Sequence, residues 1–113
     1  LIQFFQLGGV EMILAEFSIY PTDKGESVSD YVAQILKIID ESRIPYQLTP
    51  MGTILEGSWS DVMKVIGDCF SHLKIHSYRT AVNIKLDYRL GSNSRMTSKI
   101  EKIESILNTK LSH

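Results

Sequence analysis

The sequence predicts an α+β domain in which one antiparallel sheet is covered on one face by two helices. Two segments, 12–20 and 78–89, alternate apolar and polar residues with the two-residue period of a β-strand. Two other segments, after Ser27 and after Ser58, carry apolar residues at the spacing of an amphipathic helix. Between these helices, a Pro-x-Gly sequence separates two short β-prone runs, as is typical of a hairpin.

The first strand and the first helix have clear signals for their faces and their ends. Within 12–20 one face is apolar, consisting of Ile13, Ala15, Phe17 and Ile19. The sequence Ser27-Val-Ser-Asp30 matches a capping box, so we expect Ser27 to cap the helix. Pro45 disfavours helical geometry at the residue before it, so the helix must end by Ile44.

The second half of the chain repeats this order. Short strands are expected at 45–50 and 52–57. A second capping box at Ser58-Trp-Ser-Asp61 starts a helix whose apolar stripe runs to residue 73. The strand at 78–89 follows and places one apolar set on a single face: Thr80, Val82, Ile84, Leu86 and Tyr88.

A last helix is expected near 95–111, after a break at Gly91-Ser-Asn-Ser94. The full order is therefore strand, helix, strand, strand, helix, strand, with a C-terminal helix. Because both crossover connections should be right-handed, both crossover helices lie on the same face of the sheet. This is the split β-α-β, or ferredoxin-like, arrangement.

Composition narrows the classes of function. The 113 residues suit one domain, and 12 basic against 13 acidic side chains give a net charge of −1. Nothing favours a polyanion, so we expect neither nucleic acid nor a membrane as partner. The single Cys69 excludes an internal disulfide and is compatible with a cytoplasmic location. Met12 stands where the patterned sequence begins, so 1–11 is interpreted as an upstream extension or a cloning remnant and 12–113 as one domain.

The opposite face of the sheet should carry Leu14, Glu16, Ser18 and Tyr20 from the first strand and Asn83, Lys85 and Asp87 from the last. The ordinary interpretation is a solvated face, because antiparallel sheets often leave one face to water. The alternative is that this face packs on another subunit around a polar cavity, by twofold symmetry.

The sequence Pro50-Met-Gly-Thr-Ile-Leu-Glu-Gly57, preceded by Arg43-Ile-Pro-Tyr46, resembles the thiamine-binding protein family. Residues 12–21 and 79–89 resemble it too, so the likeness covers roughly 12–110. The resemblance implies a ferredoxin-like domain that assembles into homodimers or homotetramers. It further implies binding of thiamine or its hydroxymethylpyrimidine part, without catalysis and without a cofactor.

A pyrimidine ligand needs a flat apolar contact and fixed hydrogen-bonding groups, and a cationic thiazolium favours nearby carboxylates. The predicted ligand-binding residues are Glu16, Ser18, Tyr20, Thr49, Met51, Thr53, Glu56, Asn83 and Lys85. The alternative is a small oligomeric enzyme or regulatory module of the same fold with an anionic ligand, for which Lys85, Arg79 and Arg89 would matter more.

Other chemically capable residues have simpler interpretations. His72 and His76 are four residues apart, but no third ligand is placed beside them, so we interpret them as surface residues. Cys69 occupies a position of the helical stripe and is interpreted as a core residue. Trp59 is expected to cover the sheet edge. No nucleophile–base pair or metal cluster can be assembled, so an enzyme is not expected.

Overall fold

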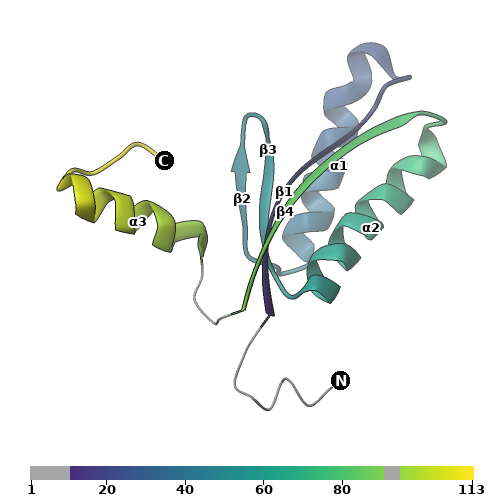
Figure 1. Ribbon diagram of the computed structural model, residues 1–113. Helices are drawn as coiled ribbons and strands as arrows, with labels where there is room; N and C mark the ends of the chain where they lie inside the picture. Colours follow the sequence, from purple (N-terminus) through teal and green to yellow (C-terminus); the bar gives the residue numbers. More distant parts are fainter. Residues whose placement is uncertain (1–10, 91–94) are drawn as a thin grey trace, which may run out of the picture.

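A computed structural model describes residues 11–90 and 95–113 (Figure 1). The predicted extension at 1–11 falls almost wholly outside these residues. The strands are β1 (Glu11–Pro21), β2 (Tyr46–Thr49), β3 (Gly52–Gly57) and β4 (Thr80–Leu90). The helices are α1 (Val28–Glu41), α2 (Trp59–His76) and α3 (Arg95–Leu107), with a short 3₁₀ turn η2 (Gly25–Ser27) before α1.

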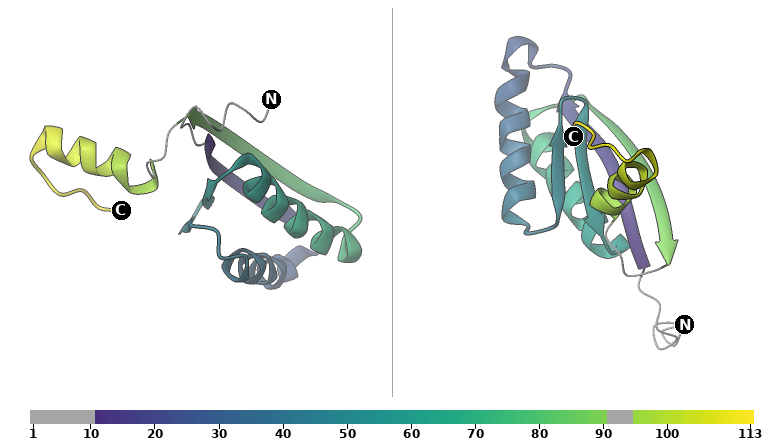
Figure 2. Two further views of the ribbon diagram at one scale, coloured as in Figure 1. Left: turned by 90° about the horizontal axis from the view of Figure 1, so that it is seen from below. Right: turned by 90° about the vertical axis from the view of Figure 1, so that its left-hand side faces the viewer.

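The predicted fold class is confirmed. The strands form one antiparallel sheet in the order β2-β3-β1-β4, so β1 is central and pairs with both β3 and β4. Both crossover helices lie on one side of the sheet (Figures 1 and 2). The core lies between this helix-covered face and the two helices.

The alternation along β1 gives the sheet its two faces. Its odd-numbered apolar residues, from Ile13 to Ile19, are at most 5% exposed, whereas Glu16 and Tyr20 on the other face are exposed. Leu55 of β3 and stripe residues of α1 and α2, including Ile39 and Val62, complete the core. We call the uncovered side, which carries the even-numbered β1 residues, the open face.

The two expected helix caps have different outcomes. The Ser58 hydroxyl accepts a hydrogen bond from the Asp61 amide at 3.1 Å, as the capping box predicts. Ser27 occupies the N-cap position of α1, as predicted, but the expected capping hydrogen bond is absent: Ser27 also ends the 3₁₀ turn, and its side chain makes no capping hydrogen bond. The Ser27 amide donates instead to the Lys24 carbonyl at 3.0 Å, within the 3₁₀ turn.

Helix α2 is longer than its apolar stripe suggested and continues through His76. The two histidine rings of α2 therefore lie close together, with centroids 5.2 Å apart. His72 also hydrogen-bonds Gln34 of α1 at 2.6 Å, so it joins the two helices. Among the described residues, no group of three potential ligands is arranged to hold a metal ion.

Helix α3 lies on the open-face side, away from α1 and α2 (Figure 2). It contacts β3 but stands largely apart from the sheet, and its apolar residues Ile103, Ile106 and Leu107 are exposed. Within the described ranges, no helix is long and apolar enough to cross a membrane.

Asp23 connects the two loops at one end of the sheet. Its carboxylate accepts hydrogen bonds from the Ser77 hydroxyl at 2.6 Å and from the Tyr78 amide at 3.0 Å. The hydrogen bond from Ser77 is the largest cause of a lowered pKa at Asp23. The loop before α1 is thereby joined to the loop that starts β4.

We predict that Asp23→Asn lowers the melting temperature at pH 7 but makes it less sensitive to acid. Because the folded-state pKa of Asp23 is depressed, its stabilisation is present above the unfolded-state pKa and is lost as pH falls through the folded value. Thermal unfolding between pH 7 and about pH 3 measures this against Glu41→Gln, an exposed carboxylate at the end of α1. Equal melting temperatures of wild type and Asp23→Asn at pH 7 would contradict the prediction.

Candidate functional site

The candidate site arises because the hairpin is shorter than the strand beside it. β3 pairs with β1 from Ile13–Gly57 to Phe17–Thr53, where the hairpin turns. β1 continues four residues further, to Pro21, paired only with β4. The sheet therefore has a step at the hairpin end, between α1 and the open face.

The turn at this step is stabilised by one hydroxyl. Thr49 donates to the Gly52 carbonyl at 2.8 Å and accepts from the Met51 amide at 3.2 Å. Pro50 supplies the fixed φ that the turn needs, and the Met51 side chain is left 85% exposed. The Thr49 hydroxyl is thus engaged in the turn, whereas Met51 is available to a ligand.

Gly52 is required by a close approach of two backbones. A Cβ atom at this position would lie 2.9 Å from the carbonyl oxygen of Phe17. Real Cβ atoms do not approach a backbone oxygen so closely, so any other residue would push the hairpin away from β1. The glycine of the Pro-x-Gly sequence therefore allows the hairpin to lie close to β1 at the step, in addition to its role in the turn.

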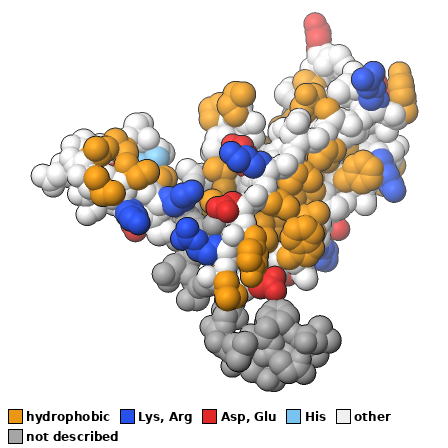
Figure 3. Space-filling view, viewed as in Figure 1, with side chains coloured by type: hydrophobic (Ala, Val, Ile, Leu, Met, Phe, Trp, Pro, Cys, Tyr) orange, Lys and Arg blue, Asp and Glu red, His pale blue; other side chains and the backbone are white. Residues whose placement is uncertain are grey.

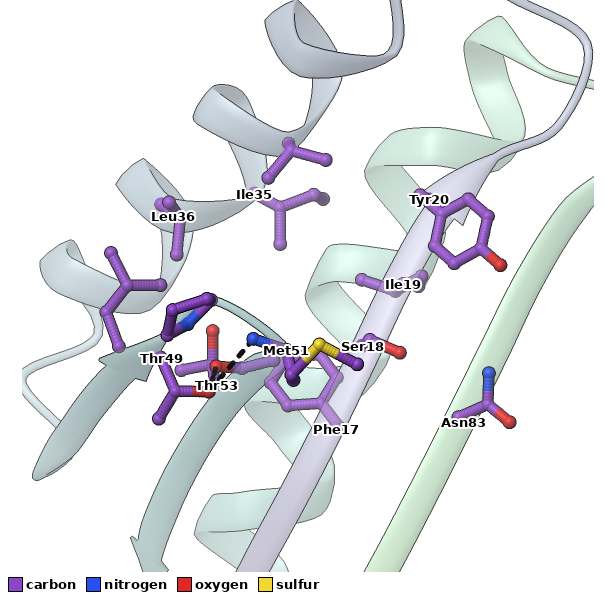
Figure 4. A pocket seen from close by; sticks show the side chains of 14 residues that line it. Phe17, Ser18, Ile19, Tyr20, Ile35, Leu36, Thr49, Met51, Thr53 and Asn83 are labelled. Atoms are coloured by element: carbon purple, nitrogen blue, oxygen red, sulfur yellow. Dashed lines mark hydrogen bonds between the residues drawn. The ribbon is translucent and has the colours of Figure 1, made fainter.

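A hollow of about 400 Å³ occupies the step (Figure 4). Its apolar wall comes from Phe17 and Ile19 of β1 and from Ile35 and Leu36 of α1. In Figure 4 the Met51 side chain lies beside Ser18 and Phe17, between the hairpin and β1. Polar groups from β1, β4 and the hairpin complete the lining: Ser18, Tyr20, Thr49, Thr53 and Asn83.

A second hollow, of about 470 Å³, adjoins the first on the open face. The two share Phe17, Ser18, Met51 and Asn83, and the second adds Glu16, Ile84 and Lys85. Strand register explains this grouping, because Glu16 lies opposite Lys85 and Ser18 opposite Asn83. A carboxylate, a hydroxyl, a carboxamide and an ammonium group thus meet beside one thioether.

The predicted ligand residues are brought together in large part, and every one except Glu56 lines one of these hollows. Thr53, however, is not on the open face. It lies opposite Phe17 in register, faces the helices and is 5% exposed, so it belongs to the inner wall.

Glu56 lies away from the step. It pairs with Leu14 three residues further along β3, is 2% exposed and borders a different hollow, near the end of α1. Its burial on the open-face side coincides with the approach of α3 to β3. Its place in the Glu-Gly motif therefore does not make it a neighbour of Met51.

Sequence reasoning missed the apolar half of the site. The hollow is lined in part by Phe17, Leu36 and Pro50. The apolar spacing of Phe17 and Leu36 was explained by a role in the core, and Pro50 by its role in the hairpin turn. Only the unequal lengths of β1 and β3 could have indicated that these core residues border an opening.

Comparison with known proteins now identifies the family. The sequence profile of thiamine-binding proteins matches residues 15–104. The chain belongs to the thiamine-binding protein family. Among its relatives, the UPF0045 protein YqgV of Bacillus subtilis is 37% identical over 102 residues, covering 85% of this chain and 98% of YqgV. A UPF0045 protein of Mycobacterium tuberculosis is 31% identical over 96 residues, covering 84% of this chain and 94% of the relative.

Solved structures of similar proteins support the fold of this family member. A hypothetical protein of Methanocaldococcus jannaschii superimposes with a TM-score of 0.73 at 28% identity, covering 81% of this chain and 95% of that one. A Thermotoga maritima protein assigned provisionally to thiamine biosynthesis or salvage has a TM-score of 0.71 at 16% identity, covering 81% and 98%. At that identity the second likeness shows the fold alone.

We predict that Gly52→Ala destabilises the protein by about 1–3 kcal/mol, because the added Cβ overlaps the Phe17 carbonyl and displaces the hairpin. Gly67→Ala is the matched control, since its Cβ would meet nothing within 4 Å on α2. It should stabilise the helix by up to about 1 kcal/mol. Urea unfolding of both variants measures the difference, and equal free energies of unfolding would refute the account of Gly52.

Proposed function

We propose that this protein binds thiamine, or its hydroxymethylpyrimidine part, without catalysing a reaction. The family supports this ligand class, and the Thermotoga maritima relative is assigned provisionally to thiamine biosynthesis or salvage. The observation that carries the proposal is the pair of adjoining hollows around Met51, each of the size that encloses a small organic ligand.

The lining supplies the contacts that an aminopyrimidine needs. Met51 is 85% exposed and offers a polarisable surface for an aromatic ring. The Ser18 hydroxyl and the Asn83 carboxamide both donate and accept hydrogen bonds, and they face each other across β1 and β4. A ring with neighbouring donor and acceptor atoms can therefore bond to both strands while it lies against the thioether.

The charges around the open-face hollow favour one position for a cationic thiazolium. Glu16 is the carboxylate that lines the open-face hollow, and it is solvent-exposed. Lys85, directly opposite, offsets part of its charge. A cationic ligand would therefore lie nearer to Glu16 and farther from Lys85, whereas an anionic ligand would reverse that preference.

A second copy would complete the site. The open-face hollow is open to solvent in a single chain, and Tyr20 and Met51 expose apolar surface beside it. Stacking the open faces of two copies would bury these side chains and exclude water from the ligand. We therefore propose that the binding form is a homo-oligomer.

We predict that Glu16→Gln weakens thiamine binding about tenfold, because the amide keeps the shape of the carboxylate but loses its attraction for the cation. Hydroxymethylpyrimidine, which has no charge, should lose much less. Titration calorimetry with both ligands gives the comparison. Glu41→Gln makes the same chemical change on the helix-covered side and should leave both affinities unchanged.

Two results would overturn the proposal. One is the absence of heat and of any rise in melting temperature for wild type at millimolar thiamine and hydroxymethylpyrimidine, since bound ligand must stabilise the folded state. The other is conversion of the ligand, which chromatography of the incubated mixture would reveal. Equal affinity of Glu16→Gln and wild type for thiamine would reject the location of the site and leave the ligand class standing.

A further inference from the structure

His72 and His76 lie outside the candidate ligand site. Helix α2 continues through His76, so the two residues lie four apart on its last two turns. Side chains at this spacing are neighbours on one side of a helix. Neither histidine lines the hollow at the step or the open-face hollow. They therefore form a pair of metal-ligating side chains that the proposed function does not use.

The two imidazole rings have the separation that one shared metal ion requires. Their centroids are 5.2 Å apart and their planes are inclined by 59°. Zinc–imidazole bonds are about 2.1 Å long, so two rings bound to one ion at roughly tetrahedral angles have centroids about 5 Å apart. His72 is half-buried and His76 is exposed, so an ion can reach them from solvent. The pair is therefore spaced as a bidentate chelate.

The hydrogen bond between His72 and Gln34 prepares one ring for a metal ion. Nε2 of His72 lies 2.6 Å from Oε1 of Gln34 on α1. A carboxamide oxygen only accepts hydrogen bonds, so Nε2 carries the proton and Nδ1 keeps a free lone pair. Histidines that bind metals usually donate their other N–H to a carbonyl or carboxylate oxygen, which fixes the tautomer and the ring. Gln34 is thus placed as a positioning residue for His72.

The end of α2 favours a cation. The last carbonyl groups of a helix carry a partial negative charge, and His76 is the last residue of α2. Lys74 lies between the histidines in sequence, but its ammonium group lies over the Phe70 ring, 5.6 Å from the centroid. Lys24 lies over Tyr31, whose centroid is 6.0 Å from that of His76. Both lysine ammonium groups are thus placed over aromatic rings.

We propose that His72 and His76 together bind one divalent transition-metal ion of the class that prefers imidazole: Zn²⁺, Ni²⁺ or Cu²⁺. Water completes the coordination, since within residues 11–90 and 95–113 no third His, Cys, Asp or Glu joins the pair. Cys69, one turn earlier on α2, is fully buried, and desolvation raises its pKa to about 12. It therefore does not supply a thiolate ligand.

The proposed metal site lies at the contact between the two crossover helices. His72 is bonded to Gln34, and His76 lies beside Tyr31, both on α1. The side of α2 next to β4 is different, because Figure 3 shows apolar side chains gathered there. The even-numbered residues of β4, Ile84 among them, are half-exposed and offer no metal ligand. An ion bound to the histidines would hold the last two turns of α2 and, through Gln34, the middle of α1.

The first test titrates protein without an affinity tag with ZnCl₂, NiCl₂ and CuCl₂, by calorimetry and by thermal unfolding. Each ion should raise the melting temperature, because an ion bound to the folded state stabilises it, and EDTA should reverse the rise. Cu²⁺ should bind most tightly, as it does at nitrogen sites. Mg²⁺ and Ca²⁺ prefer oxygen ligands and should cause no shift. No heat and no shift with all three transition metals would overturn the proposal.

Single substitutions locate the site. His72→Gln and His76→Gln each remove one of the two ligands and should weaken Zn²⁺ binding by about a hundredfold or more. His113→Gln is the matched control, since it makes the same change at the third histidine, which lies 3.4 Å from Glu104. It should bind Zn²⁺ as wild type does. Equal affinity of His72→Gln and wild type, or loss of binding in His113→Gln, would reject the location.

A relocated histidine tests the chelate geometry. Adding Lys74→His to His76→Gln keeps three histidines, but residue 74 is turned by about 200° around α2 from residue 72. The double variant should therefore bind Zn²⁺ as weakly as His76→Gln alone. Recovery of the wild-type affinity would show that the number of histidines matters and that their spacing does not, which would reject the chelate. Circular dichroism confirms the fold of each variant.

The role of Gln34 has its own test. Gln34→Ala should weaken Zn²⁺ binding about tenfold, because the ring of His72 loses the acceptor that orients it. Gln34→Glu keeps an acceptor oxygen and should bind Zn²⁺ at least as tightly as wild type. Tighter binding by Gln34→Ala than by wild type would show that Gln34 competes with the ion, and would reject its positioning role.

The metal experiments are independent of the proposed function. Wild type and His76→Gln should bind thiamine equally in the presence of EDTA, since neither histidine lines the ligand hollows. Absence of metal binding with retained thiamine binding would overturn only this inference. Metal binding without any thiamine binding would overturn only the proposed function.

Discussion

The alternation of side chains along β1 is the constraint on which the rest of the structure depends. β1 pairs with β3 on one side and along its whole length with β4 on the other, and its odd-numbered residues are the centre of the core. A shift of β1 by one residue against both neighbouring strands would bury Glu16 and expose Phe17. The same alternation that fixes the core therefore fixes which groups, Ser18 and Glu16 among them, appear on the open face beside β4.

The site depends on a difference in strand length. β1 and β4 are both 11 residues long, whereas β3 has six, so the sheet loses two strands before it ends. The Thr49 hydroxyl and the close approach at Gly52 hold the turn at that boundary. The Pro-x-Gly sequence thus has a conformational role, and its chemical contribution is the Met51 side chain that the turn projects over β1.

Sequence patterns predicted the strands and helices because alternation and capping depend on residues that are near one another in the chain. Period-two alternation gave the long strands, and the Ser58 capping box gave the start of α2. The capping box also placed Ser27 at the N-cap of α1, but it did not predict the 3₁₀ turn that ends there, in which the Ser27 side chain makes no capping hydrogen bond. The end of α2 was missed because its last turn, with His76, lies beyond the apolar stripe.

The sequence did not predict how the elements lie beside and over one another in the sheet. Thr53 and Glu56 are three residues apart in one strand, and the period of two puts them on opposite faces, at different distances from the step. Sequence placed the apolar residues of β4 on the correct face. Their half-exposed state depends on whether α2 lies over β4 or over β1, and no property of either segment alone decides that.

Lys85 connects the register of the sheet with the chemistry of the candidate site. It lies opposite Glu16 in the β1–β4 ladder, and both residues border the open-face hollow. Its positive charge opposes a cationic ligand there, whereas the carboxylate of Glu16 attracts one. Because the two residues are held opposite each other by the ladder, the register that fixes the core also sets the balance of charge that a ligand meets on the open face.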